Sequence, residues 1–483
     1  MKLKRNYFLK LKKHILRDFL KIKDVVSVNL VGSFWENPTE DNFRDIDIVV
    51  ILKKINKKKF NNCVNFVNKI KLKLFGLEAY KIIINTTFGP LKFDIEKTLV
   101  FHLMIYDEES HKNHVIKSPF TCYDWERTKF VSGKKLNNIF PVSKLQFNDF
   151  LDGRRSIKDY QKDLKKNRIN YGEYNWVGKK VFVKKKYFKI SDWQKVEFLY
   201  HVVKNILFNY FKLINQINSL PNDIQLKKLL IKIDSKNYKK NVNNFFLLRT
   251  AKKNKLKIKI KSIEKWVFKF TRNFQNFLAS ELENKTKVIF LRHCKTKLND
   301  GSFLGVNRDP EIILNKSVES KIKKLKTKRI LHIFSSEMKR CIQTSRIISK
   351  KIKLNISKNL NEKNYGHAEG MKYEQLIKKF PHMLKSWKNK KDPKFPGGEN
   401  DIDVLKRLNV FKNRLIKTIK KSGVVFVVTH NVVLKNLIGS EFGIKRSDWF
   451  KINVDHLSTV EFILIKNRLT SNFNRNILLE KKL

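Results

Sequence analysis

Apolar residues are grouped in two different ways along this chain, and the grouping predicts its secondary structure. Both ends contain short, mainly apolar runs that stop at polar or turn residues, which is the pattern of buried strands. The middle instead has apolar positions at helical spacing, as in residues 191–211 and 263–282, and Ser191 with Gln194 has the pattern of a capped helix start. The strand-like runs are residues 25–31, 48–52, 82–84, 288–291, 330–334 and 424–428.

This arrangement predicts an α/β protein of three parts. We expect residues 1–145 to form an α+β sheet domain that begins with an amphipathic helix, residues 146–284 to form a helical segment, and residues 285–483 to form a three-layer α/β/α domain. Pro141 and the turn at residues 151–155 mark the first boundary. A length of 483 residues agrees with this division, since domains average roughly 150 residues.

Composition limits the class of protein. With 41% hydrophobic and 12% aromatic residues, the chain resembles folded globular proteins rather than disordered ones. Its formal net charge of +61 could serve a nucleic-acid or anionic-membrane partner. However, lysines are spread over the whole length among abundant asparagine, isoleucine and phenylalanine, as an AT-rich coding sequence produces. We therefore favour compositional drift over a dedicated polyanion site, although the charge should still attract phosphorylated substrates.

Cysteine usage and hydropathy predict the cellular compartment of the protein. Its four cysteines are scattered and form no CxxC pair, which agrees with a reducing cytosol. No apolar run approaches the roughly 20 residues of a membrane span. The basic first 20 residues also lack the apolar core and cleavage site of a signal peptide. We therefore expect a cytoplasmic protein without a membrane span.

Candidate chemistry in the N-terminal part begins directly after the first predicted strand. Gly32 and Ser33 follow that strand, where glycine allows close backbone approach to a phosphate chain and the serine hydroxyl can hold its oxygens. Asp45 and Asp47 lead into the next strand and project from one face, so both can hold the same hard cation. Asp94, in a short alternating stretch, offers a third carboxylate.

Residues 25–100 resemble the nucleotidyltransferase superfamily of the DNA polymerase β type through these motifs. The resemblance implies that Gly32 and Ser33 bind the phosphates of a nucleoside triphosphate, and that Asp45, Asp47 and Asp94 hold Mg²⁺ ions. It also implies that the segment after the sheet shapes the acceptor pocket. The alternative is structural: the two aspartates cap a turn before a core strand, and Gly32-Ser33 forms a plain turn.

Candidate chemistry in the C-terminal part lies at the ends of the predicted strands. The first strand ends in Arg292-His293, with Thr296 and Asn299 in the following loop, and the last strand ends in His430. Between them come Ser335-Ser336 with Arg340, then Asn361-Glu362, and later Pro396-Gly397-Gly398-Glu399. The carboxyl ends of parallel strands are where open α/β sheets place their sites. An imidazole nucleophile with guanidinium groups suits phosphoryl transfer.

These motifs resemble the histidine phosphatase superfamily, phosphoglycerate mutase-like branch, over about residues 286–465. The resemblance implies that His293 forms a phosphohistidine and that Arg292, Arg340 and His430 neutralise the phosphoryl oxygens, with Asn299 and Thr296 on the substrate phosphate. Glu362 would act as general acid and base, so we expect it to be partly buried. No metal is needed in this domain. Cys294, Lys295 and Asn431 depart from the family pattern and put efficiency and substrate in question.

The combined hypothesis is a bifunctional enzyme that acts on phosphorylated small molecules such as sugar or polyol phosphates. One alternative is RNA-end processing by both domains, which the charge favours slightly. Residues 184–189 interleave lysines and aromatics and could bind RNA, but we favour core aromatics with solvated lysines. The other alternative is a non-catalytic interaction protein on degenerate enzyme scaffolds.

Overall fold

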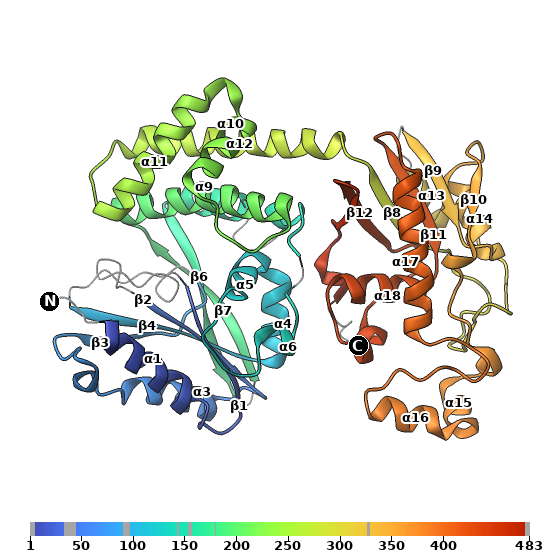
Figure 1. The fold of residues 1–483 in the computed structure, drawn as a ribbon, viewed down its shortest axis with the longest axis horizontal. Coiled ribbons are helices and arrows are strands. Elements are labelled where there is room, and N and C mark those ends of the chain that lie inside the picture. Colours follow the sequence, from blue (N-terminus) through green and yellow to red (C-terminus); the bar gives the residue numbers. More distant parts are fainter. Residues whose placement is uncertain are drawn as a thin grey trace. The chain divides into compact units, whose positions relative to one another are not determined.

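The computed structural model describes residues 5–32, 45–89, 97–142, 144–152, 157–178, 180–325 and 329–478. These form two compact units (Figure 1). The first unit consists of Met1–Leu145 and Asp149–Gln275, and the second of Gln146–Asn148 and Asn276–Leu483. Two predicted site residues, Ser33 and Asp94, lie outside the described residues.

The first unit is built on a five-stranded mixed sheet of order β3-β4-β2-β1-β5. β2 pairs in parallel with β4 and antiparallel with β1. The three strands predicted in this part of the sequence are confirmed. The bounds are β1 (Val25–Val31), β2 (Asp45–Leu52), β3 (Lys81–Asn85), β4 (Thr98–Asp107) and β5 (Val131–Gly133).

Helices cover both faces of this sheet, because alternate residues of its central strands are apolar on each side. Ile48, Val50 and Leu52 of β2 join a core that includes Leu11 and Phe19 of the first helix. Val49 and Ile51 join a second core beneath the α4–α5 pair. The helices are α1 (Arg5–Phe19), α3 (Lys57–Asn68), α4 (Glu108–Lys117), α5 (Pro119–Trp125) and α6 (Leu136–Ile139).

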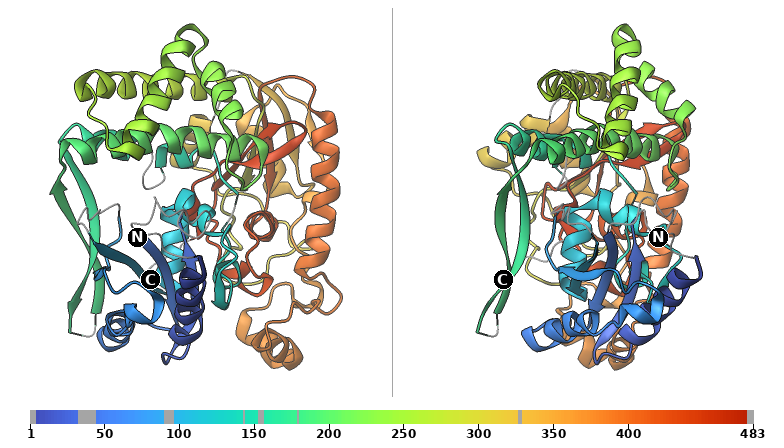
Figure 2. Two further views of the ribbon diagram at one scale, coloured as in Figure 1. Left: turned by 60° about the vertical axis from the view of Figure 1, so that its left-hand side comes forward. Right: turned by 90° about the vertical axis from the view of Figure 1, so that its left-hand side faces the viewer.

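The middle of the chain differs from the predicted helical segment in two ways. It contains a long antiparallel hairpin, β6 (Arg168–Val177) and β7 (Lys180–Lys189), shown as two long green strands in Figure 2. Most of it also belongs to the first unit, because the main chain of Gly172 pairs with Phe88 and the hairpin aromatics pack onto the first core. The division between the units therefore falls inside α12, ahead of the predicted boundary at residue 285.

The predicted helices of the middle segment are present beside the hairpin. Ser191 caps α9 and forms a reciprocal capping box with Gln194, so the predicted helix start is confirmed. Trp266 of α12 donates to Asn241 of α11 at 2.9 Å and joins these two helices. The bounds are α7 (Asp149–Asp152), α8 (Ile157–Leu164), α9 (Asp192–Asn215), α10 (Asp223–Ile233), α11 (Tyr238–Asn254) and α12 (Ile260–Glu283).

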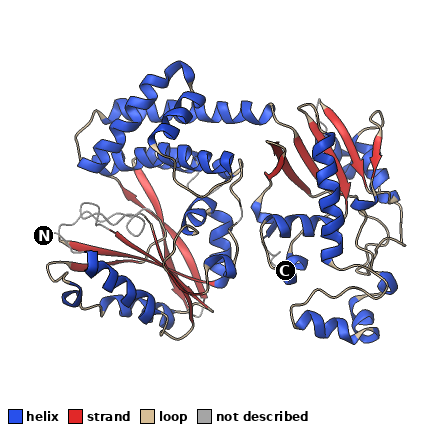
Figure 3. Cartoon of the chain, in the orientation of Figure 1, coloured by secondary structure: helices blue, strands red, loops and turns tan. Residues whose placement is uncertain are grey.

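The second unit contains a six-stranded sheet of order β10-β9-β11-β8-β12-β13 (Figure 3). Its first four strands run in parallel, and β12 joins β8 antiparallel. The three strands predicted in this part are confirmed. The bounds are β8 (Lys287–Arg292), β9 (Ile330–Ser335), β10 (Leu354–Ile356), β11 (Val424–Thr429), β12 (Thr459–Ile465) and β13 (Arg468–Ser471).

This sheet has helices on both faces, as the predicted three layers require. Phe426 and Val428 of β11 pack with Ile322 and Ile348 of the α13–α14 layer. On the opposite face, Phe334 contacts Phe411 of α17 with ring centroids 5.5 Å apart. The helices are α13 (Lys316–Leu325), α14 (Lys339–Ile348), α15 (Tyr373–Lys379), α16 (Pro381–Lys388), α17 (Asp401–Thr418) and α18 (Asn431–Glu441). Within the described ranges, no helix of either unit has the length and apolar character needed to cross a membrane.

Candidate functional site

Three parallel strands of the second unit end at one edge of the sheet and bring the predicted residues together there. In the ladder, Arg292 at the end of β8 lies opposite Thr429 of β11. The next residues along these strands, His293 and His430, have ring centroids 5.1 Å apart. Both histidines are buried. The predicted pair of strand-end histidines therefore forms one cluster.

The main chain fixes the tautomer of His293. Its Nδ1 lies 2.6 Å from the carbonyl oxygen of Cys294, and because a carbonyl only accepts, Nδ1 carries the hydrogen. Burial, followed by the positive charge of Arg340, lowers the pKa of His293 well below 6.5. The ring is therefore neutral near pH 7 and keeps a lone pair on Nε2, as a nucleophile requires.

The two arginines are held in different ways. Arg292 donates from Nη1 to the carbonyl of Val454 at 2.6 Å, and its buried Nε has no partner among the described residues. Arg340 is fully buried and donates to the carbonyls of Gly305 (2.8 Å) and Arg308 (3.0 Å). A guanidinium has five N–H groups. Arg340 also pairs with Asp309 at 3.2 Å and donates from Nε to His430, so one N–H remains for a phosphate, whereas Arg292 retains several. The Nε–H of Arg292 is the stronger candidate. It is buried and unpaired, which costs free energy that a hydrogen bond to a phosphate oxygen would offset.

His430 is oriented by Arg340 and Ser336. Arg340 donates from Nε to His430 Nδ1 at 3.3 Å, so the hydrogen of a neutral His430 lies on Nε2, which is 2.9 Å from the hydroxyl of Ser336. Burial and then the Arg340 charge lower the pKa of His430 well below 6.5. His430 is thus a neutral donor, and the serine that the sequence placed at the end of β9 sets its orientation.

Glu362 is buried, with 7% of its surface exposed, in agreement with the expected partial burial. Its carboxylate accepts from the main-chain N–H of Lys363 at 2.9 Å and of Val432 at 3.3 Å. Val432 lies in the first turn of α18, two residues after His430. This contact joins the Glu362 loop to the strand-end histidines.

Arg407 of α17 holds the Glu362 loop and was not identified from the sequence. It donates to the carbonyls of Asn359, Asn361 and Glu362 at 2.7–3.1 Å and pairs with Glu399 at 2.9 Å. Glu399, from the predicted Pro-Gly-Gly-Glu motif, therefore positions Arg407. A single arginine in a charged helix carries no sequence signal for this role.

Thr296 and Asn299 stabilise the loop that follows His293. The N–H and hydroxyl of Thr296 both lie within hydrogen-bonding distance of Asn299 Oδ1, at 2.7 Å and 3.1 Å. The hydroxyl hydrogen of Thr296 is therefore used inside the loop, and the amide nitrogen of Asn299 remains as a donor toward a substrate phosphate. Their predicted phosphate contacts stay a prediction.

Cys294 and His456 are two further residues of this site. Cys294 replaces the glycine of the family pattern, and its fully buried side chain packs in the core beneath the sheet. Burial raises the pKa of its thiol, which stays protonated.

His456, from the turn before β12, donates from Nδ1 to the carbonyl of His293 at 3.2 Å, with ring centroids 5.5 Å apart. Burial lowers the pKa of His456 to about 4. No sequence motif indicated that His456 belongs to this site.

A second group of predicted residues meets in the first unit. Gly32 has a φ of +86°, and a Cβ added there would collide with the carboxylate of Asp47. Asp45 and Asp47 lie on one face of β2, with half-buried side chains. His102, which the sequence reasoning left without a role, lies opposite Asp47 on β4, with Nδ1 2.9 Å from the carboxylate and Nε2 2.9 Å from the Thr87 carbonyl.

These residues fit the implied Mg²⁺ site in part. A glycine cradle beside paired carboxylates has the oxygen donors that Mg²⁺ prefers. Within the described residues, however, no three histidine, cysteine or carboxylate side chains are grouped to hold a metal. Asp94, the predicted third carboxylate, lies outside them, as does Ser33.

Comparison with known proteins supports the predicted resemblance for the second unit. Residues 288–473 match the family model of the histidine phosphatase superfamily, branch 1. The C-terminal part of the chain thus has a histidine phosphatase α/β fold. The match does not extend to the first unit, so the nucleotidyltransferase resemblance of residues 25–100 stays a prediction.

Two curated relatives agree with this match. Phosphoglycerate mutase-like protein 4 of Arabidopsis thaliana is 28% identical over 167 residues, which are 33% of this chain and 72% of the relative. Fructose-2,6-bisphosphatase of Saccharomyces cerevisiae is 29% identical over 193 residues, 38% of this chain. This chain spans 41% of the length of the yeast enzyme.

Solved structures with similarity include two phosphatases. A mycobacterial glucosyl-3-phosphoglycerate phosphatase is 19% identical with a TM-score of 0.34, over 39% of this chain and 98% of that chain. A phosphoserine phosphatase from Entamoeba histolytica is 19% identical with a TM-score of 0.34, over 40% of this chain and 100% of that chain.

Proposed function

We propose that the second unit is a phosphomonoesterase that works through a phosphohistidine on His293. The observation that carries the proposal is the hydrogen bond from His293 Nδ1 to the Cys294 carbonyl, because it leaves the Nε2 lone pair available. His293, the nucleophile, follows Arg292 in the sequence. The buried Nε of Arg292 has no partner among the described residues. A buried carboxyl, Glu362, supplies the acid and base.

The reaction divides into two displacements at phosphorus. In the first, His293 Nε2 bonds to phosphorus, the ester P–O bond breaks, and Glu362 protonates the leaving oxygen. In the second, Glu362 takes a proton from water, the oxygen of that water bonds to phosphorus, and the P–N bond breaks. Arg292 and Arg340 stabilise the charge on the equatorial oxygens in both steps. Inorganic phosphate leaves, and His293 returns to its neutral form.

The proposed substrate is a phosphorylated small molecule, such as a sugar or polyol phosphate. The named activity of a curated relative supports this class, since the yeast protein is a fructose-2,6-bisphosphatase. A buried nucleophile also favours a compact ester that can enter the site, because a bulky polymer end would have to displace the surrounding loops.

Phosphate release from a panel of phosphorylated metabolites, measured in EDTA, tests this proposal. EDTA removes divalent cations and so silences any metal-dependent reaction of the first unit. We expect release by the wild type and at least a 1,000-fold loss in His293→Ala, since removing a covalent nucleophile can cost on the order of 10⁶ in kcat. His382→Ala, an exposed histidine of α16, is the matched control and should retain full activity. Equal release by His293→Ala, or none by the wild type, would reject the proposal.

We further propose nucleotidyl transfer by the first unit, because Gly32 lies against the Asp47 carboxylate as a phosphate-binding turn beside paired acids would. Asp45 and Asp47, with Asp94, would hold Mg²⁺, which would supply charge neutralisation on the triphosphate. The transferase would then attach a nucleotide to a phosphorylated metabolite related to the phosphatase substrate. Pyrophosphate release from nucleoside triphosphates with such acceptors tests this. Asp47→Asn should abolish release, whereas Asp223→Asn, an acid on the exposed surface of α10, should not.

A further inference from the structure

The outer strand of the β6–β7 hairpin is exposed along nearly its whole length. β7 pairs with β6 over ten residues, from Arg168 opposite Lys189 to Val177 opposite Lys180. Of the ten residues of β7, only Val181 and Phe188 are partly buried. β7 carries five lysines and no acidic residue, and β6 adds one arginine and one glutamate. The hairpin therefore presents a basic surface.

One face of the hairpin anchors it to the first unit. Tyr174, Trp176 and Val181 share this face and pack against the core beneath the sheet. The Tyr174 hydroxyl donates to the carbonyl of Ile105 at 2.7 Å, and the main chain of Gly172 exchanges two 2.8 Å hydrogen bonds with Phe88. The hairpin is thus fixed to the sheet, and its opposite face has a defined orientation.

The opposite face combines basic and aromatic side chains. Residues two apart on a strand share a face, so Lys180, Phe182, Lys184, Lys186 and Phe188 lie in one row. Phe182 is 49% exposed, and Phe188 contacts Tyr171 of β6 with ring centroids 6.0 Å apart. Glu173 pairs with Lys186 at 2.5 Å, so Lys180 and Lys184 supply the charge that no described acid neutralises.

This geometry reverses the interpretation favoured from the sequence. Core aromatics with solvated lysines would require a helix with one buried face. In the observed strand, Phe182 is exposed between lysines on the same face. Exposing the apolar ring of a phenylalanine to water is unfavourable, and a partner stacked on the ring would remove this cost. Lysines alone would suffice to keep an exposed strand from pairing with other chains, so the aromatic members need another explanation.

We propose that this face of the hairpin, the row from Lys180 to Phe188, binds single-stranded nucleic acid. Bases would stack on Phe182 while Lys180 and Lys184 contact the backbone phosphates, a combination that binds strands with little sequence preference. The net charge of +61 would add long-range attraction for a polyanion. The proposed function of neither unit requires this site, and neither depends on it.

Fluorescence anisotropy with labelled 12-nucleotide oligouridylate and oligothymidylate, added to the full chain, tests the proposal. We expect binding that weakens steeply with salt. Phe182→Ala should weaken it about 10-fold because it removes stacking. The double variant Lys180→Ala/Lys184→Ala should reduce the slope of log affinity against log salt by about 1.4, or about 0.7 for each backbone phosphate that is no longer neutralised. Comparison of the two oligonucleotides separates RNA from DNA preference.

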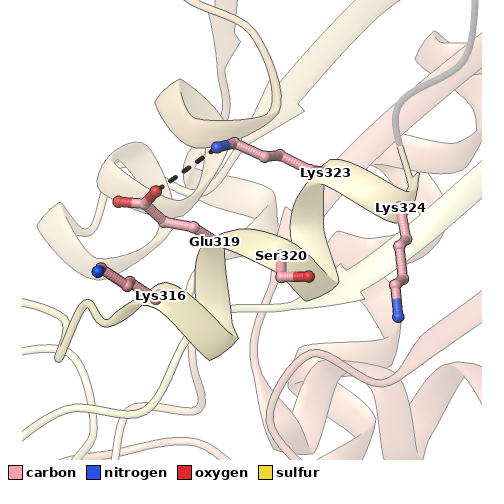
Figure 4. A pocket seen from close by; sticks show the side chains of 5 residues that line it. All are labelled: Lys316, Glu319, Ser320, Lys323 and Lys324. Carbon is pink, nitrogen blue, oxygen red and sulfur yellow. Dashed lines mark ion pairs between the residues drawn. The ribbon is translucent and has the colours of Figure 1, made fainter.

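The control removes the same charge elsewhere. Helix α13 has an exposed basic face around a shallow hollow of about 620 Å³, lined by Lys316, Glu319, Ser320, Lys323 and Lys324 (Figure 4). No aromatic residue lines it, and Glu319 pairs with Lys323 at 3.8 Å. Lys316→Ala/Lys324→Ala should therefore leave the salt slope unchanged. If this control weakens binding as much as the hairpin variants, if Phe182→Ala binds like the wild type, or if neither oligonucleotide binds, the proposal is wrong.

Discussion

At the scale of single residues, the carbonyl of Cys294 decides which nitrogen of His293 can attack phosphorus. The sequence identified His293 as the nucleophile but not its tautomer, because the acceptor is a main-chain atom whose direction depends on the loop. We predict that His293 stays neutral, with its hydrogen on Nδ1, from pH 7 down to below 6.5, since burial and Arg340 lower its pKa. Long-range ¹H–¹⁵N spectra, assigned with a His293→Asn variant, would measure this. Titration at or above pH 6.5, or a hydrogen on Nε2, would contradict it.

His456 gives a second prediction at this scale. Its Nδ1–H supports the main-chain carbonyl of His293, so it acts as a positioning residue. We expect His456→Leu to lower kcat about 10-fold with little change in KM, as the loss of one partly buried hydrogen bond implies. His456→Asn keeps a donor at a similar position and should recover most of the rate. Equal rates for the two variants would show that the hydrogen bond is not used.

At the scale of elements, α17 supports the catalytic loop through a single side chain. Arg407 holds three carbonyls around Glu362 and is itself held by Glu399. We predict that Arg407→Met lowers kcat about 10- to 100-fold, the range typical of residues that orient a catalytic group. Steady-state kinetics measure this, and Arg414→Met, an exposed arginine on the same helix, is the control. If both variants retain wild-type kcat, the loop does not depend on Arg407.

The elements also show how far the sequence could predict this fold. Strands β1, β2, β8, β9 and β11 were predicted because most of their residues are buried or half-buried, so their sequences are mainly apolar. The hairpin was missed because β7 is exposed on both faces, so its sequence lacks the alternation that marks a half-buried strand. The candidate residues at strand ends were found because they directly follow these apolar strands. His456 and Arg407 were missed because they come from a turn and a helix that carry no motif.

At the scale of the whole molecule, each unit contains a histidine whose pKa is lowered by burial. His111 of α4 is fully buried, and neither of its ring nitrogens has a hydrogen-bond partner among the described residues. Burial lowers its pKa to about 4, and it lowers that of His456 in the second unit to about 4 as well. An unfolded histidine has a pKa of about 6.5. Acid should therefore destabilise the two units together.

The sign of this effect follows from proton uptake. Between pH 6.5 and 4 the unfolded chain binds protons at these histidines that the folded chain does not, so the free energy of unfolding falls as the pH falls through this window. For His111 the loss can reach about 3 kcal/mol at pH 4, because about 2.5 pKa units correspond to roughly that energy. We predict that His111→Leu, measured by thermal unfolding of the full chain between about pH 7.5 and 4, reduces this acid sensitivity. His382→Leu on the exposed surface of α16 should leave it unchanged. An identical pH dependence for His111→Leu and the wild type would mean that folding does not lower the pKa of His111.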